Sequence, residues 1–181
     1  MRALSILACF LIASPVAGDE AKSPVTLAYP ASIESLDELV RMSECQLLDL
    51  YRRAEPGPLP TGFAPGRMIS NPGRRTTVPV SRFTKAFVWQ GKYFDDGGIM
   101  TNKMFHFRFI KGEVQQGESW IDGRPSIIID YSQTSLIFRP YRDELREISP
   151  GIYLGIMFKR DACKPKIVTY FAIDARCGSC R

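Results

Sequence analysis

The chain has 181 residues, of which 45% are hydrophobic, and a formal net charge of +5. This length suits one domain with a sizeable core. The basic balance is compatible with anionic surfaces or ligands, but Lys and Arg form no dense stripe interleaved with aromatic residues, so we expect no nucleic-acid binding. No segment has the roughly 20 apolar residues of a membrane-spanning helix, so the chain is not expected to span a membrane.

Residues 1–18 have the layout of a secretory signal peptide. Arg2 precedes an uninterrupted run of apolar and small residues over 3–13, and Val16-Ala17-Gly18 places small residues where a signal peptidase cleaves. The sequence therefore predicts a periplasmic or secreted protein whose mature form begins near Asp19. A buried N-terminal helix is the alternative.

Four cysteines lie outside the predicted signal peptide: Cys45, Cys163, Cys177 and Cys180. An even number in an oxidising compartment predicts structural disulfides, with three possible pairings. The Cys177–Cys180 spacing is also that of redox pairs and metal sites. Only Arg181 follows it, so no helix can lower the thiol pKa there, and export disfavours reduced thiolates. We predict no metal site and no cofactor.

The N-terminal third contains the helical signals. Residues 19–32 are expected to be a linker, followed by a helix near 35–42 and a longer one near 44–54. Ser35 with Glu38, and Ser43 with Gln46, have the spacing of capping boxes. Apolar residues recur at helical spacing after both. The Pro- and Gly-rich segment 59–81 is expected to wrap the surface or cover an opening, with disorder of its middle as the alternative.

From Phe83 onward the apolar residues alternate with a period of two, which is typical of strands. Phe105, Phe107 and Phe109 are expected on one face of such a strand, with a hairpin tip at Lys111-Gly112. Asp122-Gly123 is the strongest turn signal. Further strands are expected at 113–121, 126–131, 141–148, 152–159 and 167–175.

Seven or eight short strands without helical crossovers predict an antiparallel meander, closed as a barrel or folded as a sandwich. The last two strands favour the barrel, because they are apolar on both faces. Ile152, Leu154 and Ile156 alternate with Tyr153 and other apolar residues. Such a strand needs the barrel interior on one side and a cover on the other, which the N-terminal helices could supply. Residues 33–181 are thus predicted to be one mainly β domain, an antiparallel β-barrel with an N-terminal helical segment.

A set of short motifs carries a resemblance over about residues 43–173. The motifs are Trp89-Gln90-Gly91-Lys92-Tyr93-Phe94, Asn102, residues 117–125, Asp130-Tyr131-Ser132, Arg142-Asp143-Glu144-Leu145-Arg146 and residues 150–155. Together they resemble a group of small bacterial exported proteins with lipocalin-like, calycin-type β-barrels. The resemblance implies the fold and transfers no activity.

The segment Arg142–Arg146 is the densest group of charges between apolar strands. In an extended chain Arg142, Glu144 and Arg146 share one face, while Asp143 and Leu145 share the other. If the first face lines the barrel interior, the two arginines could hold an anionic head group. The alternative is a solvated outer face whose ion pairs contribute little to stability.

The function predicted from these features is binding of a small, partly apolar and possibly anionic ligand inside the barrel. The candidate binding residues are Trp89, Lys92, Asn102, Trp120, Asp130, Tyr131, Arg142, Glu144, Arg146 and Tyr153. One alternative is an enzyme that uses Asp130, Tyr131, the single histidine His106 or the Arg142–Arg146 segment. The other is a structural or interaction protein with a filled barrel. The sequence specifies neither the ligand nor the oligomeric state.

Overall fold

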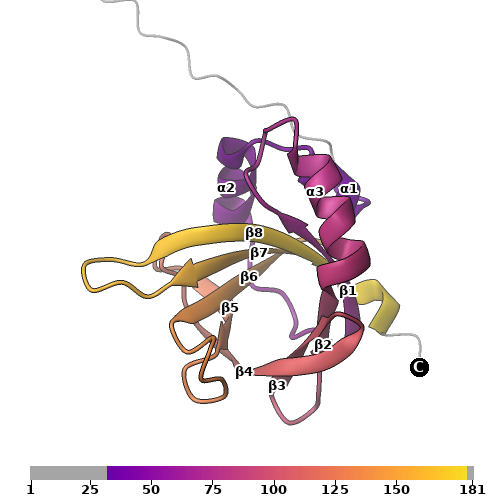
Figure 1. The fold of residues 1–181 in the computed structure, drawn as a ribbon. Helices are drawn as coiled ribbons and strands as arrows, with labels where there is room; N and C mark the ends of the chain where they lie inside the picture. The colour runs from indigo at the N-terminus through magenta and orange to yellow at the C-terminus, as the bar shows by residue number, and fades with distance from the viewer. Residues whose placement is uncertain (1–31, 179–181) are drawn as a thin grey trace, which may run out of the picture.

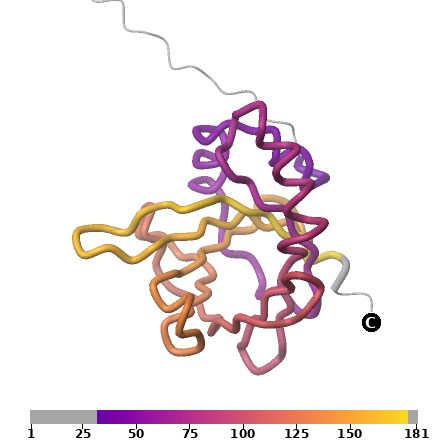
Figure 2. The backbone as a smooth tube through the Cα atoms, in the orientation of Figure 1, coloured from indigo at the N-terminus to yellow at the C-terminus, as the bar shows by residue number. Residues whose placement is uncertain are grey.

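The structure is a computed structural model that describes residues 32–178, in which eight antiparallel strands form a closed barrel (Figures 1 and 2). The strands follow one another around the barrel in chain order, and β8 pairs with β1 to close it. Their bounds are β1 Gly62–Ile69, β2 Trp89–Phe94, β3 Ile99–Met104, β4 Phe107–Glu118, β5 Pro125–Asp130, β6 Tyr141–Ser149, β7 Ile152–Lys159 and β8 Lys166–Asp174. The predicted mainly β barrel is confirmed. The predicted signal peptide and residues 19–31 lie outside the described residues.

The two N-terminal helices form where capping boxes were predicted. Helix α1 spans Leu36–Val40 and α2 spans Glu44–Arg53. At the start of α2, the backbone N–H of Ser43 donates to the side chain of Gln46 at 2.9 Å, and the Ser43 hydroxyl accepts from the Gln46 N–H at 3.4 Å. These bonds satisfy backbone donors that a helix start leaves unpaired.

The prediction that residues 59–81 wrap the surface is wrong. Gly62–Ile69 forms β1, and Thr77–Phe83 forms helix α3, which continues as a π-helical turn, η1 (Thr84–Val88). Strand β1 pairs with β2 through residues 62–65 and with β8 through residues 66–69. Pro65, which has no N–H to donate, lies where the pairing passes from one neighbour to the other. Pro65 therefore marks the position within β1 where the hydrogen-bonded neighbour changes from β2 to β8.

The predicted hairpin tip at Lys111-Gly112 is also wrong, because both residues lie inside β4. The chain turns instead at Phe105-His106, where φ is 49° and 68°. The alternation expected of Phe105, Phe107 and Phe109 fails there, and all three side chains are exposed. The turn predicted at Asp122-Gly123 is confirmed between β4 and β5, with Gly123 at φ 71°.

Apolar residues of the barrel form two separate cores. One fills the interior and includes Trp89, Tyr153 and Phe171. The other lies outside the barrel, where Leu154 and Ile156 of β7 pack with residues of the N-terminal helices such as Leu47. Figure 1 shows the helices gathered on the side of the barrel that carries β7 and β8. The prediction that the last strands are covered on both faces is confirmed for β7 and for the second half of β8, whereas Ile167 and Val168 at the start of β8 are exposed.

Candidate functional site

A polar cluster lies inside the barrel. It joins four buried side chains from four parts of the sheet: Lys92 of β2, Asn102 of β3, Tyr131 at the end of β5 and Asp143 of β6. Lys92 Nζ donates to Asp143 Oδ2 at 2.7 Å, to Tyr131 Oη at 3.0 Å and to Asn102 Oδ1 at 3.0 Å. An ammonium group has three N–H donors, so Lys92 has none left for a ligand.

Further hydrogen bonds hold the members of the cluster in place. Trp89 Nε1 donates to Asn102 Oδ1 at 2.9 Å, and Asn102 Nδ2 donates to the carbonyl of Ile110 at 3.2 Å. The Tyr131 hydroxyl donates to Asp143 Oδ2 at 2.6 Å. Because each acceptor is fixed by a second partner, the cluster is rigid before any ligand arrives.

Asp143 has one oxygen without a partner. Oδ2 accepts from Lys92 and Tyr131, whereas the buried Oδ1 accepts no hydrogen bond from the described residues. Burial lowers the pKa of Lys92, against the opposing effect of the Asp143 carboxylate. Burial, followed by the charge of Asp143, raises the pKa of Tyr131, so the phenol stays a neutral donor. The one hydrogen-bonding group of this cluster that has no partner among the described residues is therefore an acceptor, the Oδ1 atom of Asp143.

The cluster forms the floor of a cavity of about 110 Å³ inside one end of the barrel. Apart from Thr169 its other walls are apolar, and the side chains near its mouth are half-buried. The lining residues are Met68, Trp89, Lys92, Asn102, Met104, Tyr131, Phe138, Asp143, Met157, Thr169 and Phe171. The mouth lies at the end of the barrel that carries the connections β1–β2, β3–β4, β5–β6 and β7–β8. We call this the open end.

Four of the residues predicted for the site line this cavity: Trp89, Lys92, Asn102 and Tyr131. Tyr153 lies inside the barrel but away from the cavity, where its hydroxyl donates to the carbonyl of Pro58 at 2.7 Å. Asp143 was missed. The signal that points to it is Leu145, an apolar residue on the same face of β6, but Ile148 falls on the opposite face, so alternation alone did not identify the interior face.

The interpretation that Arg142, Glu144 and Arg146 face the barrel interior is wrong. The interior face of β6 carries Asp143 and Leu145, and the three charged side chains lie on the outer face. The alternative, a solvated outer face, is also wrong, since Glu144 and Arg146 are both 0% exposed. The loop between β4 and β5 and helix α2 cover them, which the sequence of β6 does not reveal.

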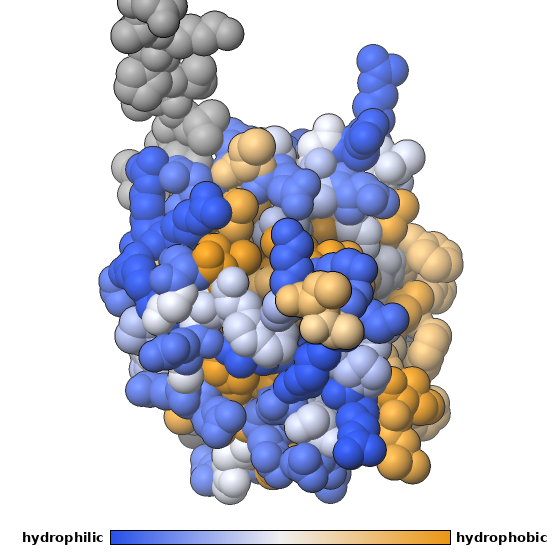
Figure 3. All heavy atoms as spheres, turned by 90° about the vertical axis from the view of Figure 1, so that its left-hand side faces the viewer, coloured by the Kyte–Doolittle hydropathy of each residue, from blue (hydrophilic) through white to orange (hydrophobic). Residues whose placement is uncertain are grey.

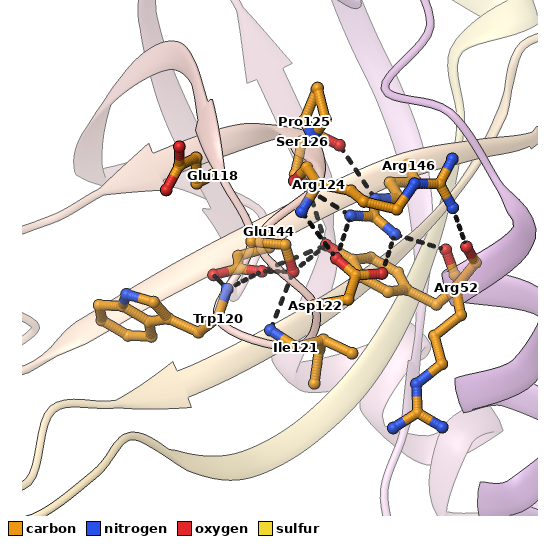
Figure 4. Close-up of polar contacts among 12 residues, drawn as sticks. Arg52, Glu118, Trp120, Ile121, Asp122, Arg124, Pro125, Ser126, Glu144 and Arg146 are labelled. Atoms are coloured by element: carbon orange, nitrogen blue, oxygen red, sulfur yellow. Dashed lines mark hydrogen bonds and ion pairs between the residues drawn. The ribbon is translucent and has the colours of Figure 1, made fainter.

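Arg146 uses its whole guanidinium within the protein (Figure 4). It forms two hydrogen bonds to the Asp122 carboxylate, at 2.6 and 2.8 Å. The remaining donors reach the carbonyls of Tyr51, Arg124 and Pro125 at 3.0 to 3.1 Å. Hydrogen bonds from Arg146 hold the pKa of Asp122 below its ordinary value. Arg146 thus joins β6 to α2 and to the β4–β5 loop.

Glu144 is satisfied in the same way. It accepts from the hydroxyl of Ser119 at 2.5 Å, from the hydroxyl of Tyr51 at 3.2 Å and from the backbone N–H of Trp120 at 3.0 Å. Arg142 pairs with it at 3.0 Å and lies over the Trp120 ring, 4.2 Å from its centroid. Figure 4 shows Glu144 and Trp120 joined by hydrogen bonds beside the Asp122 group. The arrangement is that of a structural clamp on the outer wall of the barrel.

The remaining candidates lie apart from the cavity. Asp130 pairs with Arg160 at 2.6 Å on the outer face. Burial would raise the pKa of Asp130, but hydrogen bonds from Ser132 and the charge of Arg160 outweigh it and lower the pKa. His106 is exposed in the turn between β3 and β4, where its backbone N–H donates to Gln90 Oε1 at 3.1 Å.

Two of the four cysteines have described side chains. Cys45 and Cys163 are exposed free thiols in this structure. The side chains of Cys177 and Cys180 lie outside the described part of the chain, so the pairing of the C-terminal cysteines stays a prediction. Within residues 32–178, no group of three or more His, Cys, Asp or Glu is placed to hold a metal ion. No helix in that range is long and apolar enough to cross a membrane.

Comparisons with known proteins concern the fold alone. No family model matches the chain, and no curated protein sequence matches it. Among solved structures it is similar to a protein from Thermomonospora curvata, with a TM-score of 0.50 and 15% sequence identity over 75% of this chain and 89% of that chain. The two share a fold, and at this identity the likeness carries no activity from one to the other.

Proposed function

We propose that this chain is an exported, lipocalin-like barrel protein that binds a small, partly apolar molecule at the open end of the barrel. The observation that carries the proposal is Asp143 Oδ1, a buried acceptor without a partner among the described residues, on a side chain that lines a cavity whose other walls are mainly apolar. An unpaired buried acceptor costs about 1–3 kcal/mol, and a bound donor would remove that cost. Apolar pockets with a few convergent polar groups are the usual form of small-molecule sites.

The free acceptor defines the chemistry of the ligand. Because all three donors of Lys92 are used, an anion entering the cavity would find no free N–H on it. The anionic head group expected from the sequence also loses its basis, since that expectation placed Arg142 and Arg146 inside the barrel. The ligand we propose therefore presents a hydroxyl or N–H group to Asp143 and an apolar surface to the methionine and phenylalanine walls.

The volume limits what can enter. An engineered apolar cavity of about 150 Å³ holds benzene, so a cavity of about 110 Å³ holds a group no larger than a small ring or a short chain. Any further part of the ligand would extend through the mouth.

The test compares two probes of similar size, phenol and toluene, by isothermal titration. Phenol can donate to Asp143 Oδ1 and toluene cannot, so we expect phenol to bind at least about tenfold more tightly. Asp143→Asn should reduce this preference, because it replaces the carboxylate by a weaker acceptor. Asp130→Asn, on the outer face, is the matched control and should keep the preference. Equal binding of the two probes, or binding of neither, would overturn the proposal.

Export is tested separately. Protein recovered from the exported fraction of cells should begin at or near Asp19, as read by N-terminal sequencing. Exported material that still begins at Met1 would contradict cleavage of residues 1–18. Native mass spectrometry of the same material would show whether a small molecule is retained.

A further inference from the structure

Large hydrophobic side chains gather at the open end of the barrel. Among the described residues, twelve such side chains are exposed. Ten of them lie in the connections at this end or in the first three residues of the strand that follows each connection. The two exceptions are Leu59 and Trp120. The most exposed are Phe83, Phe87, Phe105, Phe107, Leu136 and Ile137. Figure 3 shows apolar side chains gathered along the right-hand edge of the face it presents, beside a mainly hydrophilic surface.

The helix formed by α3 and η1 has its apolar face turned outward. Phe83 and Phe87 are each 60% exposed, with their ring centroids 5.1 Å apart. The polar residues Ser81 and Thr84 are buried instead, and the Ser81 hydroxyl accepts from Arg67 Nε at 3.1 Å. A helix that covers a soluble protein normally shows the opposite polarity. This helix is therefore built to present phenylalanine to its surroundings.

Two loops add exposed apolar side chains at the same end of the barrel. In the β3–β4 turn, Phe105 has a positive φ, which is rare for a bulky residue, and its ring stacks on Phe109 with centroids 6.4 Å apart. In the β5–β6 connection, Leu136 and Ile137 are 94% and 81% exposed. Exposed apolar side chains gathered at one end of a molecule are typical of a contact site with a membrane or a protein.

Charge distinguishes the two ends of the barrel. The connections at the open end contain seven basic residues and one acidic residue, Asp161. The basic residues are Arg74, Arg75, Arg82, Lys85, Arg139, Arg160 and Lys164. The three connections at the opposite end contain Asp95, Asp96 and Asp122 with a single Arg124. Arg160 pairs with Asp130 of β5, and the exposed apolar groups stand among the other basic side chains.

We propose that the open end docks on the surface of an anionic phospholipid membrane. The exposed phenylalanine, leucine and isoleucine side chains would enter the boundary between head groups and acyl chains, and the surrounding Lys and Arg would contact the phosphates. The charge argues against a second copy of the chain as the occupant, because two such ends would bring like charges together. The proposal does not rest on ligand binding, although docking would place the cavity mouth against lipid.

The test is flotation of the full chain with two kinds of vesicle, phosphatidylcholine alone and phosphatidylcholine containing phosphatidylglycerol. We expect binding to the anionic vesicles that weakens as salt is added, and much weaker binding to the neutral ones. Because residues 3–13 are themselves apolar, every comparison is repeated with a chain that begins at Asp19. Circular dichroism establishes that each variant is folded.

Two double variants separate the apolar and electrostatic parts. Arg82→Gln with Arg139→Gln should weaken binding to anionic vesicles roughly 25-fold, since each cation near such a surface contributes about fivefold. Phe83→Ser with Phe87→Ser should weaken it at least about tenfold.

The matched controls lie away from the open end and should leave binding unchanged. Leu59→Ser removes an exposed apolar side chain, and Arg52→Gln with Arg53→Gln removes two charges at the end of α2, where Arg124 contacts the Arg52 carbonyl. Absence of flotation with anionic vesicles at low salt would overturn the proposal. So would sedimentation showing a dimer that the phenylalanine variant dissociates while vesicle binding is unchanged, because the patch would then be a self-association surface.

Discussion

Two adjacent residues of β6 have opposite roles because they lie on opposite sides of one sheet. Asp143 points into the barrel and keeps one acceptor free beside an apolar cavity. Glu144 points outward and accepts hydrogen bonds from Tyr51, Ser119 and Trp120. Burial alone therefore does not indicate a binding role. The feature that separates the two carboxylates is whether their hydrogen-bonding capacity is already used.

The Asp122–Arg146 pair should make stability depend on acid pH. Arg146 is 0% exposed, so Asp122→Asn leaves its charge without an anionic partner and should cost about 2–3 kcal/mol at neutral pH. The folded-state pKa of Asp122 is depressed. Its stabilising contribution is thus complete above the unfolded value of about 3.9 and is lost as the pH falls through the folded-state pKa. Urea unfolding of both proteins should show the difference narrowing in acid, and a constant difference would contradict this account.

The interior pair should behave as a coupled unit. Asp143→Leu leaves the Lys92 charge buried without an anionic partner and should cost about 3–5 kcal/mol. Lys92→Met should be costly for the converse reason. The double variant should be more stable than either single variant, because it leaves no unpaired charge inside the barrel. Chemical unfolding of the four proteins measures the coupling, and additive single effects would refute it.

At the scale of elements, glycine positions in the strands allow the barrel to close around its aromatic residues. A Cβ on Gly66 of β1 would lie 2.5 Å from the Trp89 ring, and one on Gly155 of β7 would lie 2.2 Å from the Phe171 ring. Trp89 and Phe171 pack edge to face with centroids 5.6 Å apart. These strands are therefore shaped to receive the rings that border the cavity.

Substitution of two glycines should separate packing from backbone strain. Gly155→Ala places a methyl group against the Phe171 ring and should cost about 1–3 kcal/mol, with a change in tryptophan fluorescence because Trp89 rests on that ring. Gly123→Ala meets no atom within 4 Å but keeps a φ of 71°, so it should cost about 1–2 kcal/mol without a spectral change. An unchanged fluorescence spectrum of Gly155→Ala would contradict this account, because it would mean that the barrel interior accommodates the added methyl group without moving Trp89.

At the scale of the whole molecule, barrel and helices share a core and should unfold together. Leu47 of α2 is fully buried against the outer face of the barrel. Leu47→Ala should therefore lower the free energy of unfolding by about 2–5 kcal/mol. Circular dichroism and tryptophan fluorescence should report one common midpoint, shifted equally. Two separate transitions would mean that the helices are an independent layer.

The local features of this protein were predictable from the sequence because they depend on neighbouring residues. The capping residues Ser35 and Ser43 mark the helix starts, Asp122-Gly123 marks a turn, and strands apolar on both faces, such as 152–159, predict a barrel with an outer cover. Of the predicted site residues, Trp89, Lys92, Asn102 and Tyr131 meet in one cavity.

The remainder was decided by tertiary structure. Alternation along β6 divides Arg142, Glu144 and Arg146 from Asp143, but period two does not say which set faces inward, because that depends on the register with β5 and β7. β1 has weak strand propensity, and the pairing of its two halves with β2 and β8 makes it a strand. The free oxygen of Asp143 follows from contacts among four segments far apart in the chain, and only the closed barrel brings those segments together.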